Sequence, residues 1–176
     1  MDIIKLLADK VKKPTEKRAE LVGAINEGTF TVDSIAAVKD GIDEKGTGLI
    51  LEAMEAVTNG NPAAADLKWL NFAEVYISSA NNTVKREASR VVGNIAHIFP
   101  DNLEPAVQKL LVNAADGGTV IRWGSAYALS KIILIPRYAK SNLYDVLTEL
   151  AEKEQDNAVK NQYLNGLKKA KKSRGE

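Results

Sequence analysis

The sequence predicts an all-α protein built from about five stacked helical hairpins. The first observation is a recurring pattern whose apolar residues fall on one helical face, found at residues 84–95, 121–132 and 159–170. These segments end at residues 95, 132 and 170, so the period is 37 and then 38 residues, which is typical of helical-hairpin repeats. The second observation is that the 12 glycines and 5 prolines gather between the apolar-periodic segments, which favours long helices over many short strands.

Composition indicates a globular protein and excludes several kinds of site. Of the 176 residues, 45% are hydrophobic and 27% are charged, as in a folded domain. The sequence has no cysteine, which excludes disulfides, thiolate catalysis and cysteine-ligated metals, and fits a cytoplasmic protein. The N-terminal stretch lacks the basic and apolar regions of a signal peptide. The longest apolar run, at 132–135, is too short to cross a bilayer, so we expect no membrane partner.

Charge is distributed unevenly along the chain. The net charge is only +1, but residues 1–80 carry 9 basic and 13 acidic side chains, whereas residues 81–176 carry 15 basic and 10 acidic ones. We therefore expect acidic partners to prefer the C-terminal half.

Turn residues divide the chain into five pairs of helices, and residues 59–62 form the clearest break. The expected helices are 2–11 and 14–25, 32–40 and 45–57, 66–79 and 83–98, 102–114 and 119–135, and 143–152 and 157–172. We treat residues 1–176 as a single domain. Within it we assign irregular N-terminal repeats to 1–60, regular repeats to 61–172 and a polar tail to 173–176.

Three helix starts carry their own signals. Pro14 suits a first helical position, where its missing N–H costs no hydrogen bond. Gly46 and Gly48 each lower helix propensity by up to about 1 kcal/mol, so we expect the helix at 45–57 to fray or begin late. Asp101 stands three residues before Glu104, as in a capping box, and is expected to cap the following helix.

Two helices have unusual surfaces. The helix at 66–79 is apolar over much of its circumference, so we expect it to be central. The helix at 157–172 ends in a strongly basic stretch, made of Lys168, Lys169, Lys171, Lys172 and, just beyond it, Arg174. We favour a solvated end cap, because cations stabilise a helix C-terminus, and we keep a nucleic-acid-binding tail as the alternative.

The recurring pattern resembles the second helix of HEAT repeats. Its best copy reads Val84-Lys85, then Ala88, then Val91-Val92-Gly93-Asn94-Ile95. The copy at 121–132 is nearly as good and the copy at 159–170 is looser. The resemblance covers residues 66–172 and implies an armadillo-like, right-handed α-α superhelix of about five hairpins whose second helices line a concave face. It implies an architecture and no particular member of the family.

The second position of the pattern is always basic, occupied by Lys85, Arg122 and Lys160. In HEAT-like arrays this residue commonly pairs with an acidic or amide residue in a neighbouring turn, and Asn82, Asp116 and Asp156 stand in suitable places. We favour such a structural ladder over a binding role for these three cations.

Positions three, seven and eleven of the pattern point away from the packed stripe and predict the binding surface. In the last three repeats they are Arg86, Arg90, Asn94, Trp123, Tyr127, Lys131, Asn161, Asn165 and Lys169. Trp, Tyr and Arg dominate binding hot spots, because each buries a large area and keeps a polar group. We expect the concave-face residues from Arg86 to Asn165 to bind the partner. Alternatively, Trp123 packs against the adjacent helix, if the register differs by one.

The sequence predicts no catalytic, metal or cofactor site. Its single histidine, His97, lies late in a helix with no partner base or nucleophile evident in the sequence. Residues 117–119, Gly-Gly-Thr, precede a helix, but two glycines beside Asp116 indicate a turn rather than a phosphate loop. The sequence favours a non-enzymatic protein over an enzyme.

Two functions follow from the resemblance. The first is a non-enzymatic scaffold that binds a protein or peptide carrying apolar and acidic groups. The alternative is a nucleic-acid-binding protein similar to the HEAT-like DNA alkylation-repair glycosylases, with the cations on phosphates and the aromatic rings stacked on a base. No acidic residue aligns convincingly with the acid of those enzymes. A third possibility is a resemblance to the HEAT-like proteins that handle bilin pigments, but the sequence contains no residue specific to that group.

Overall fold

The computed structural model describes residues 2–175, and within them it contains helices and no β-strand. The α-helices are α1 (Ile3–Ala8), α2 (Pro14–Asn26), α3 (Val32–Ala36), α4 (Glu44–Gly60), α5 (Leu67–Tyr76), α6 (Asn82–Ile95), α7 (Glu104–Ala114), α8 (Thr119–Ile132), α9 (Pro136–Ala139), α10 (Leu143–Lys153) and α11 (Asn157–Arg174). Short 3-10 helices are η1 (Lys39–Gly41), η2 (Pro62–Ala64) and η3 (Ala96–Ile98). The predicted all-α class is therefore confirmed.

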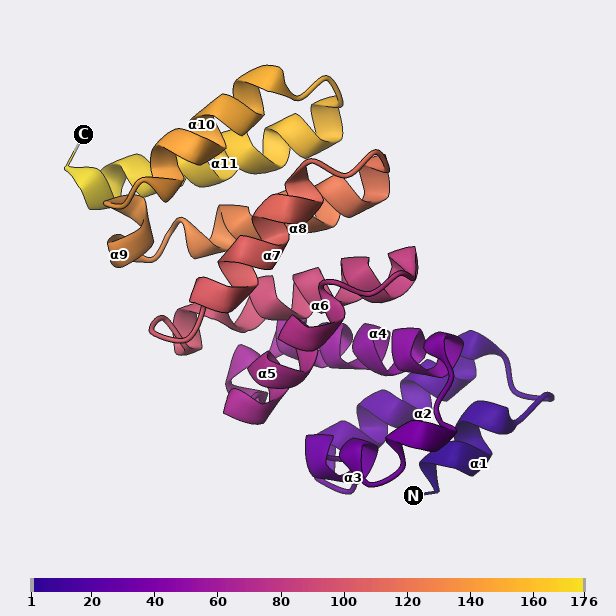
Figure 1. The fold of residues 1–176 in the computed structure, drawn as a ribbon. Helices are drawn as coiled ribbons and strands as arrows, with labels where there is room; N and C mark the ends of the chain where they lie inside the picture. Colours follow the sequence, from indigo (N-terminus) through magenta and orange to yellow (C-terminus); the bar gives the residue numbers. More distant parts are fainter. Residues whose placement is uncertain (1, 176) are drawn as a thin grey trace.

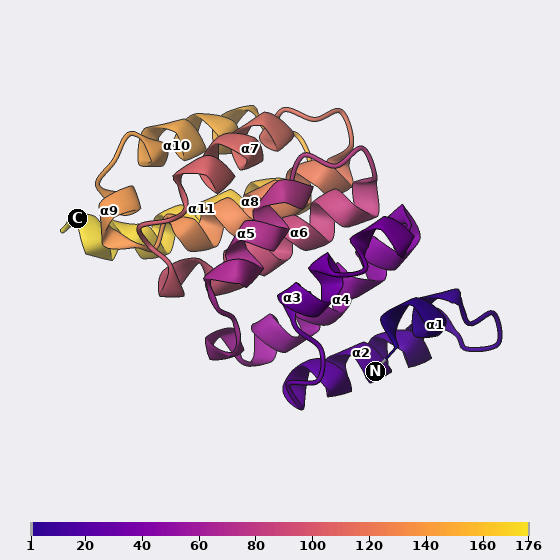
Figure 2. The same ribbon diagram turned by 60° about the horizontal axis from the view of Figure 1, so that its bottom comes forward.

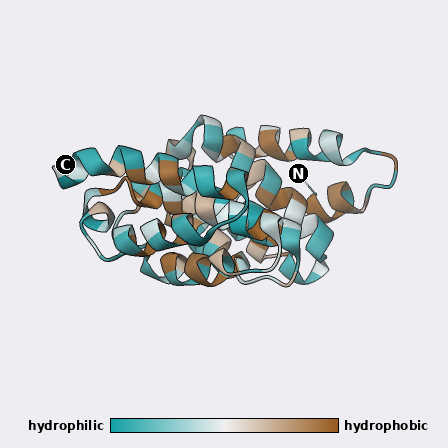
Figure 3. Cartoon of the chain, turned by 90° about the horizontal axis from the view of Figure 1, so that it is seen from above, coloured by the Kyte–Doolittle hydropathy of each residue, from teal (hydrophilic) through white to brown (hydrophobic). Residues whose placement is uncertain are grey.

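The helices lie in two layers, with α1 and α11 at opposite ends of the array (Figures 1 and 2). In the layer we call the second-helix layer, α2, α4, α6, α8 and α11 each pack against the next. The first-helix layer holds α3, α5, α7 and α10, of which α5, α7 and α10 each cover the helix that follows in sequence. Apolar side chains from both layers form one continuous core. Figure 3 shows hydrophobic and hydrophilic residues alternating along the helices.

Glycines let three consecutive helices of the second-helix layer approach closely. A Cβ atom on Gly93 of α6 would lie 2.8 Å from the Cα of Ala128 on α8. A Cβ atom on Gly166 of α11 would lie 2.8 Å from both the Cα and the carbonyl oxygen of Ser130. A side chain at either position would collide with the backbone of α8 and push the two helices apart. The close spacing of these helices therefore requires glycine at positions 93 and 166.

Ion pairs between successive hairpins form the expected ladder in part. Lys85 Nζ lies 3.2 Å from Asp116 Oδ2, and Arg122 Nε lies 2.9 Å from Glu154 Oε2. Each pair joins a helix of the second-helix layer to the loop of the next hairpin. The Arg122 guanidinium lowers the pKa of Glu154, whereas the backbone N–H of Gly118 is the main cause of the lowered pKa of Asp116, with Lys85 adding to it.

Of the expected ladder partners, Asp116 pairs with Lys85, whereas Asp156 forms no ion pair with the three cations. Asp156 caps α11 by accepting from the N–H groups of Ala158 and Val159, and Glu154 takes its place beside Arg122. Lys160, in the last hairpin, has no ion pair with any residue in the described range. The ladder needs a following hairpin to supply the acid, and the described chain offers none after α11.

Two predicted helix starts are wrong. Helix α7 begins at Glu104 without a side-chain cap, and Asp101 instead accepts a 2.7 Å hydrogen bond from Arg137 Nη1. Helix α4 begins at Glu44 in spite of its glycines, because Asp43 Oδ1 accepts a 2.7 Å hydrogen bond from the N–H of Gly46. Pro14 occupies the first position of α2, as predicted.

Helix α5 is not central, although its sequence is apolar over much of its circumference. It buries Trp69, Leu70 and Ala73 against the core and leaves Leu67 and Val75 exposed. The central positions belong to the second-helix layer, in which α6 packs against both α4 and α8 as well as α5.

We predict that Gly166→Ala destabilises the protein by about 1–3 kcal/mol, because the added methyl meets the α8 backbone. Urea unfolding followed by circular dichroism measures the loss. The matched control is Gly23→Ala in α2, where nothing lies within 4 Å of the added atom. This variant should be neutral or more stable by up to about 1 kcal/mol. A similar gain for Gly166→Ala would contradict the close approach of α11 and α8.

Candidate functional site

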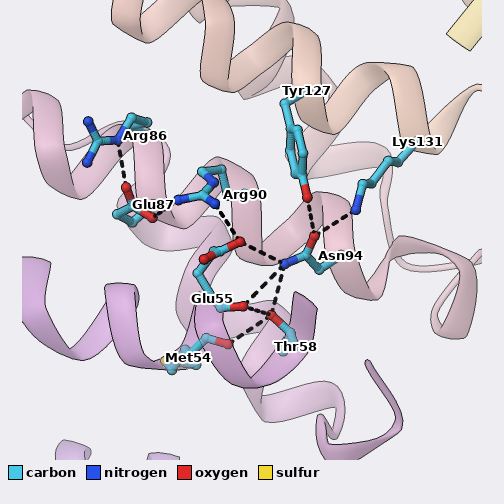
Figure 4. A network of polar contacts seen from close by, with 9 residues as sticks. All are labelled: Met54, Glu55, Thr58, Arg86, Glu87, Arg90, Asn94, Tyr127 and Lys131. Atoms are coloured by element: carbon cyan, nitrogen blue, oxygen red, sulfur yellow. Dashed lines mark hydrogen bonds and ion pairs between the residues drawn. The ribbon is translucent and has the colours of Figure 1, made fainter. Parts of the chain in front are cut away.

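A network of polar side chains joins α4, α6 and α8 on the second-helix layer (Figure 4). Two of its members are buried carboxylates: the side chain of Glu87 on α6 is 2% exposed and that of Glu55 on α4 is 9% exposed. A buried carboxylate is strongly unfavourable unless cations and hydrogen bonds compensate it. The surrounding cations are therefore part of the fold as well as part of the surface.

Arginines from α6 supply this compensation. Arg90 Nη2 lies 2.7 Å from Glu55 Oε1, and Arg90 Nη1 lies 2.9 Å from Glu87 Oε2. Arg86 Nε lies 2.6 Å from Glu87 Oε1, so both oxygens of Glu87 are engaged. The terminal nitrogens of Arg86 make no further hydrogen bond within residues 2–175 and point away from the network (Figure 4). Arg86 therefore keeps two nitrogens free for a partner.

Asn94 connects the three helices through its side-chain amide. Its Oδ1 accepts hydrogen bonds from Tyr127 Oη at 2.7 Å and from Lys131 Nζ at 2.8 Å, both on α8. Its Nδ2 donates toward Glu55 and Thr58 of α4, with the Oγ1 atom of Thr58 at 3.2 Å. The amide thus uses its acceptor on one neighbouring helix and its donors on the other.

Aromatic rings extend the network toward the start of α8. The rings of Trp123 and Tyr127 are stacked, with centroids 5.4 Å apart. Lys131 Nζ lies 4.5 Å from the centroid of the Tyr127 ring, within cation–π range. Trp123 is half-buried, and its indole N–H has no hydrogen-bond partner in the described part of the chain. Trp123 therefore presents an unpaired hydrogen-bond donor and an apolar ring at the surface.

A shallow groove of about 480 Å³ lies beside these side chains, and we call it the Arg–Trp groove. Its lining comes from α6 (Arg86 and Arg90), from α8 (Thr119, Val120 and Trp123) and from the start of α11 (Asp156 and Ala158). Val120 is 51% exposed, so the apolar part of the groove is open to solvent. The groove combines an apolar floor with a free guanidinium edge.

The structure brings together six of the eight predicted site residues and separates two. Arg86, Arg90, Asn94, Trp123, Tyr127 and Lys131 belong to the network or the groove. Asn161 and Asn165 are exposed on α11 and make no side-chain hydrogen bond to another described residue. The predicted exposure of Asn94 is wrong, because this residue is only 3% exposed. Asn94 is packed between α4 and α8 and cannot contact a partner directly.

Sequence reasoning missed the two buried carboxylates. Glu55 and Glu87 stand in helices whose buried faces are mostly apolar and carry no other charged residue, and an isolated charged residue is normally assigned to solvent. The available signal was local: Arg90 stands three residues after Glu87, a spacing typical of helical ion pairs, and Arg86 stands directly before it. The partner of Glu55 lies 35 positions away, so no local pattern indicates it.

A larger hollow, of about 640 Å³, lies at the N-terminal end between α1, α4 and the start of α6. Its charged lining is mixed in sign, and much of it is already engaged: Lys12 pairs with Glu20, and Lys17 donates to the carbonyl oxygen of Leu7. The Arg–Trp groove is the better candidate, because its guanidinium edge and apolar floor are both unoccupied by other parts of the chain.

No cluster of three or more His, Cys, Asp or Glu side chains with metal-binding geometry occurs among residues 2–175. None of the helices described is both long enough and apolar enough to span a bilayer.

We predict that Arg90→Met destabilises the protein by about 3 kcal/mol, because it leaves Glu55 and Glu87 buried with one cation fewer. Chemical denaturation at pH 7 measures the difference from wild type. Arg18→Met, at an exposed position on α2 with no ion pair in the described chain, is the matched control and should change stability by less than about 0.5 kcal/mol. Equal effects of the two substitutions would show that Arg90 does not compensate the buried carboxylates.

No protein-family model, no curated protein and no solved structure matches this chain.

Proposed function

We propose that this chain is a HEAT-like α-α superhelix that acts as a non-enzymatic scaffold, binding a protein or peptide on its second-helix layer. The repeat period of 37 and 38 residues and the two-layer packing of helical hairpins support the architecture. The Arg–Trp groove carries the functional part of the proposal. It lies on the surface that would be the concave face of such an array.

The chemistry of the groove defines the partner. Trp123 and Val120 offer an apolar surface for an aromatic or aliphatic side chain. Beside them, the free nitrogens of Arg86 fit a carboxylate, which a guanidinium binds with two parallel hydrogen bonds. The expected ligand is a segment with an acidic residue close to a large apolar one. Tyr127 and Lys131 support this surface by positioning Trp123 and Asn94.

Charge balance favours a peptide over a nucleic acid at this site. The network contains the cations Arg86, Arg90 and Lys131, of which Arg90 pairs through its two terminal nitrogens with Glu55 and Glu87. Two carboxylates therefore offset three cations, and Asp156 adds a negative charge at the groove. Nucleic-acid binding depends on several uncompensated cations along the phosphate backbone. The alternative of a glycosylase-like DNA-binding protein has less support, since Glu87 is also occupied by arginines on both oxygens.

The same proposal assigns the protein no cofactor and a cytoplasmic location. The location rests on the absence of cysteine from the sequence.

Selection from a random peptide library displayed on phage tests this function. We expect the recovered peptides to share an acidic residue within one or two positions of an aromatic or aliphatic one. Trp123→Ala should weaken their binding by about 2 kcal/mol or more, because a hot-spot ring loses its buried area. Fluorescence anisotropy of a labelled selected peptide measures the affinity.

Phe72→Ala is the matched control, because Phe72 is also a half-buried ring packed on a tyrosine one turn later, in the first-helix layer. It should cost stability without changing peptide affinity. Selected peptides that bind wild type and Trp123→Ala equally well would rule out the groove as their site.

A further inference from the structure

Helix α11 carries an unusual concentration of positive charge. Between residues 157 and 174 it contains six basic residues and no acidic one. Four of the lysines, Lys168, Lys169, Lys171 and Lys172, are exposed and form no ion pair with any described residue. The turns beside the C label in Figure 3 are correspondingly almost all hydrophilic.

The exposed face of α11 is a stripe of amides followed by lysines. Its buried face, which includes Val159, Tyr163 and Ala170, packs on α8, α9 and α10. The opposite face presents Asn157, Asn161, Asn165, Lys168, Lys169 and Lys172 to solvent. By helical rise, this amide–lysine stripe is about 22 Å long. Along its length every charged group is positive and every amide is available for hydrogen bonds.

The acidic residues of the neighbouring helix do not neutralise the stripe. Asp145, Glu149 and Glu152 of α10 are exposed, and the one ion pair that they form within residues 2–175 joins Glu149 to Lys153 of the same helix. No ion pair links α10 to the lysines of α11 within residues 2–175. The positive potential of the amide–lysine stripe is therefore available to a partner.

We propose that the amide–lysine stripe of α11 binds the sugar–phosphate backbone of a nucleic acid. Lysine and asparagine side chains are common donors to phosphate oxygens, and such contacts carry no sequence information. A lipid surface fits less well, because membrane-surface helices bury an apolar face, and Leu164, at 46% exposure, is the one large apolar residue exposed on α11. The partner is thus a polyanion held by hydrogen bonds and charge, bound without sequence preference.

The lysines of the stripe lie outside the Arg–Trp groove. The groove takes only Asp156 and Ala158 from the start of α11 and none of the lysines. A peptide bound in the groove would therefore leave these lysines accessible, and separate substitutions can remove the two activities.

The test is fluorescence anisotropy with a labelled single-stranded DNA of mixed sequence, 20 nucleotides long, across a salt series. We expect micromolar-range binding at low salt, and affinity should fall steeply with salt because about four phosphate contacts release counterions. The triple variant Lys168→Ala, Lys169→Ala, Lys172→Ala should bind at least about tenfold more weakly than wild type. The slope of log affinity against log salt concentration should become less steep by about two. A duplex of the same sequence and vesicles containing a quarter phosphatidylserine are measured in parallel.

The matched control is Lys10→Ala, Lys39→Ala, Lys45→Ala, which removes the same charge from exposed, unpaired lysines in the N-terminal half. It should retain wild-type affinity and slope. The proposal is overturned if wild type does not bind DNA, if both triple variants lose affinity equally, or if binding occurs to the vesicles alone. Because all six lysines are exposed, circular dichroism should show that both triple variants are folded like wild type. If either alanine variant is less stable than wild type, the corresponding triple glutamine variant replaces it.

Discussion

The buried amide of Asn94 is the interaction on which the geometry of the site depends. Asn94 lies on α6 between α4 and α8. Its oxygen accepts hydrogen bonds from α8 and its nitrogen donates to α4, so a shift of either helix would leave a buried polar atom unpaired. An unpaired buried polar group costs about 1–3 kcal/mol, which makes this arrangement more specific than apolar packing. Arg90 and its two carboxylates complete the same layer of polar contacts.

Close helix packing and the polar network act together. Gly93 allows α6 to approach α8, and the neighbouring Asn94 then reaches α4 and α8 at the same level. Glu87 holds both Arg86 and Arg90, which fixes the guanidinium groups before any partner arrives. Side chains that are already ordered lose less entropy on binding. The groove is thus a consequence of how the second-helix layer is spaced.

The fold was largely predictable, because its signals are local and repeated. Apolar periodicity, turn residues and the period indicated the helices and, for the last three hairpins, their pairing. Helix α4 began earlier than its glycines implied because Asp43 caps it, a contribution that propensity does not include. The site was predictable only in part. Position eleven of the recurring pattern predicted an exposed Asn94, but this side chain is covered by α4 and α8. Glu55 could not be identified at all, since only its three-dimensional contact with Arg90 explains its burial.

The most direct measurement is a double-mutant cycle between Asn94 and Tyr127, with Asn94→Ala, Tyr127→Phe and the double variant unfolded in urea. If the amide links α6 to α8 as described, the two substitutions should be non-additive, with a coupling energy of about 0.5 kcal/mol or more. Changes that add to within about 0.3 kcal/mol would show that the two side chains are energetically independent and would contradict the account.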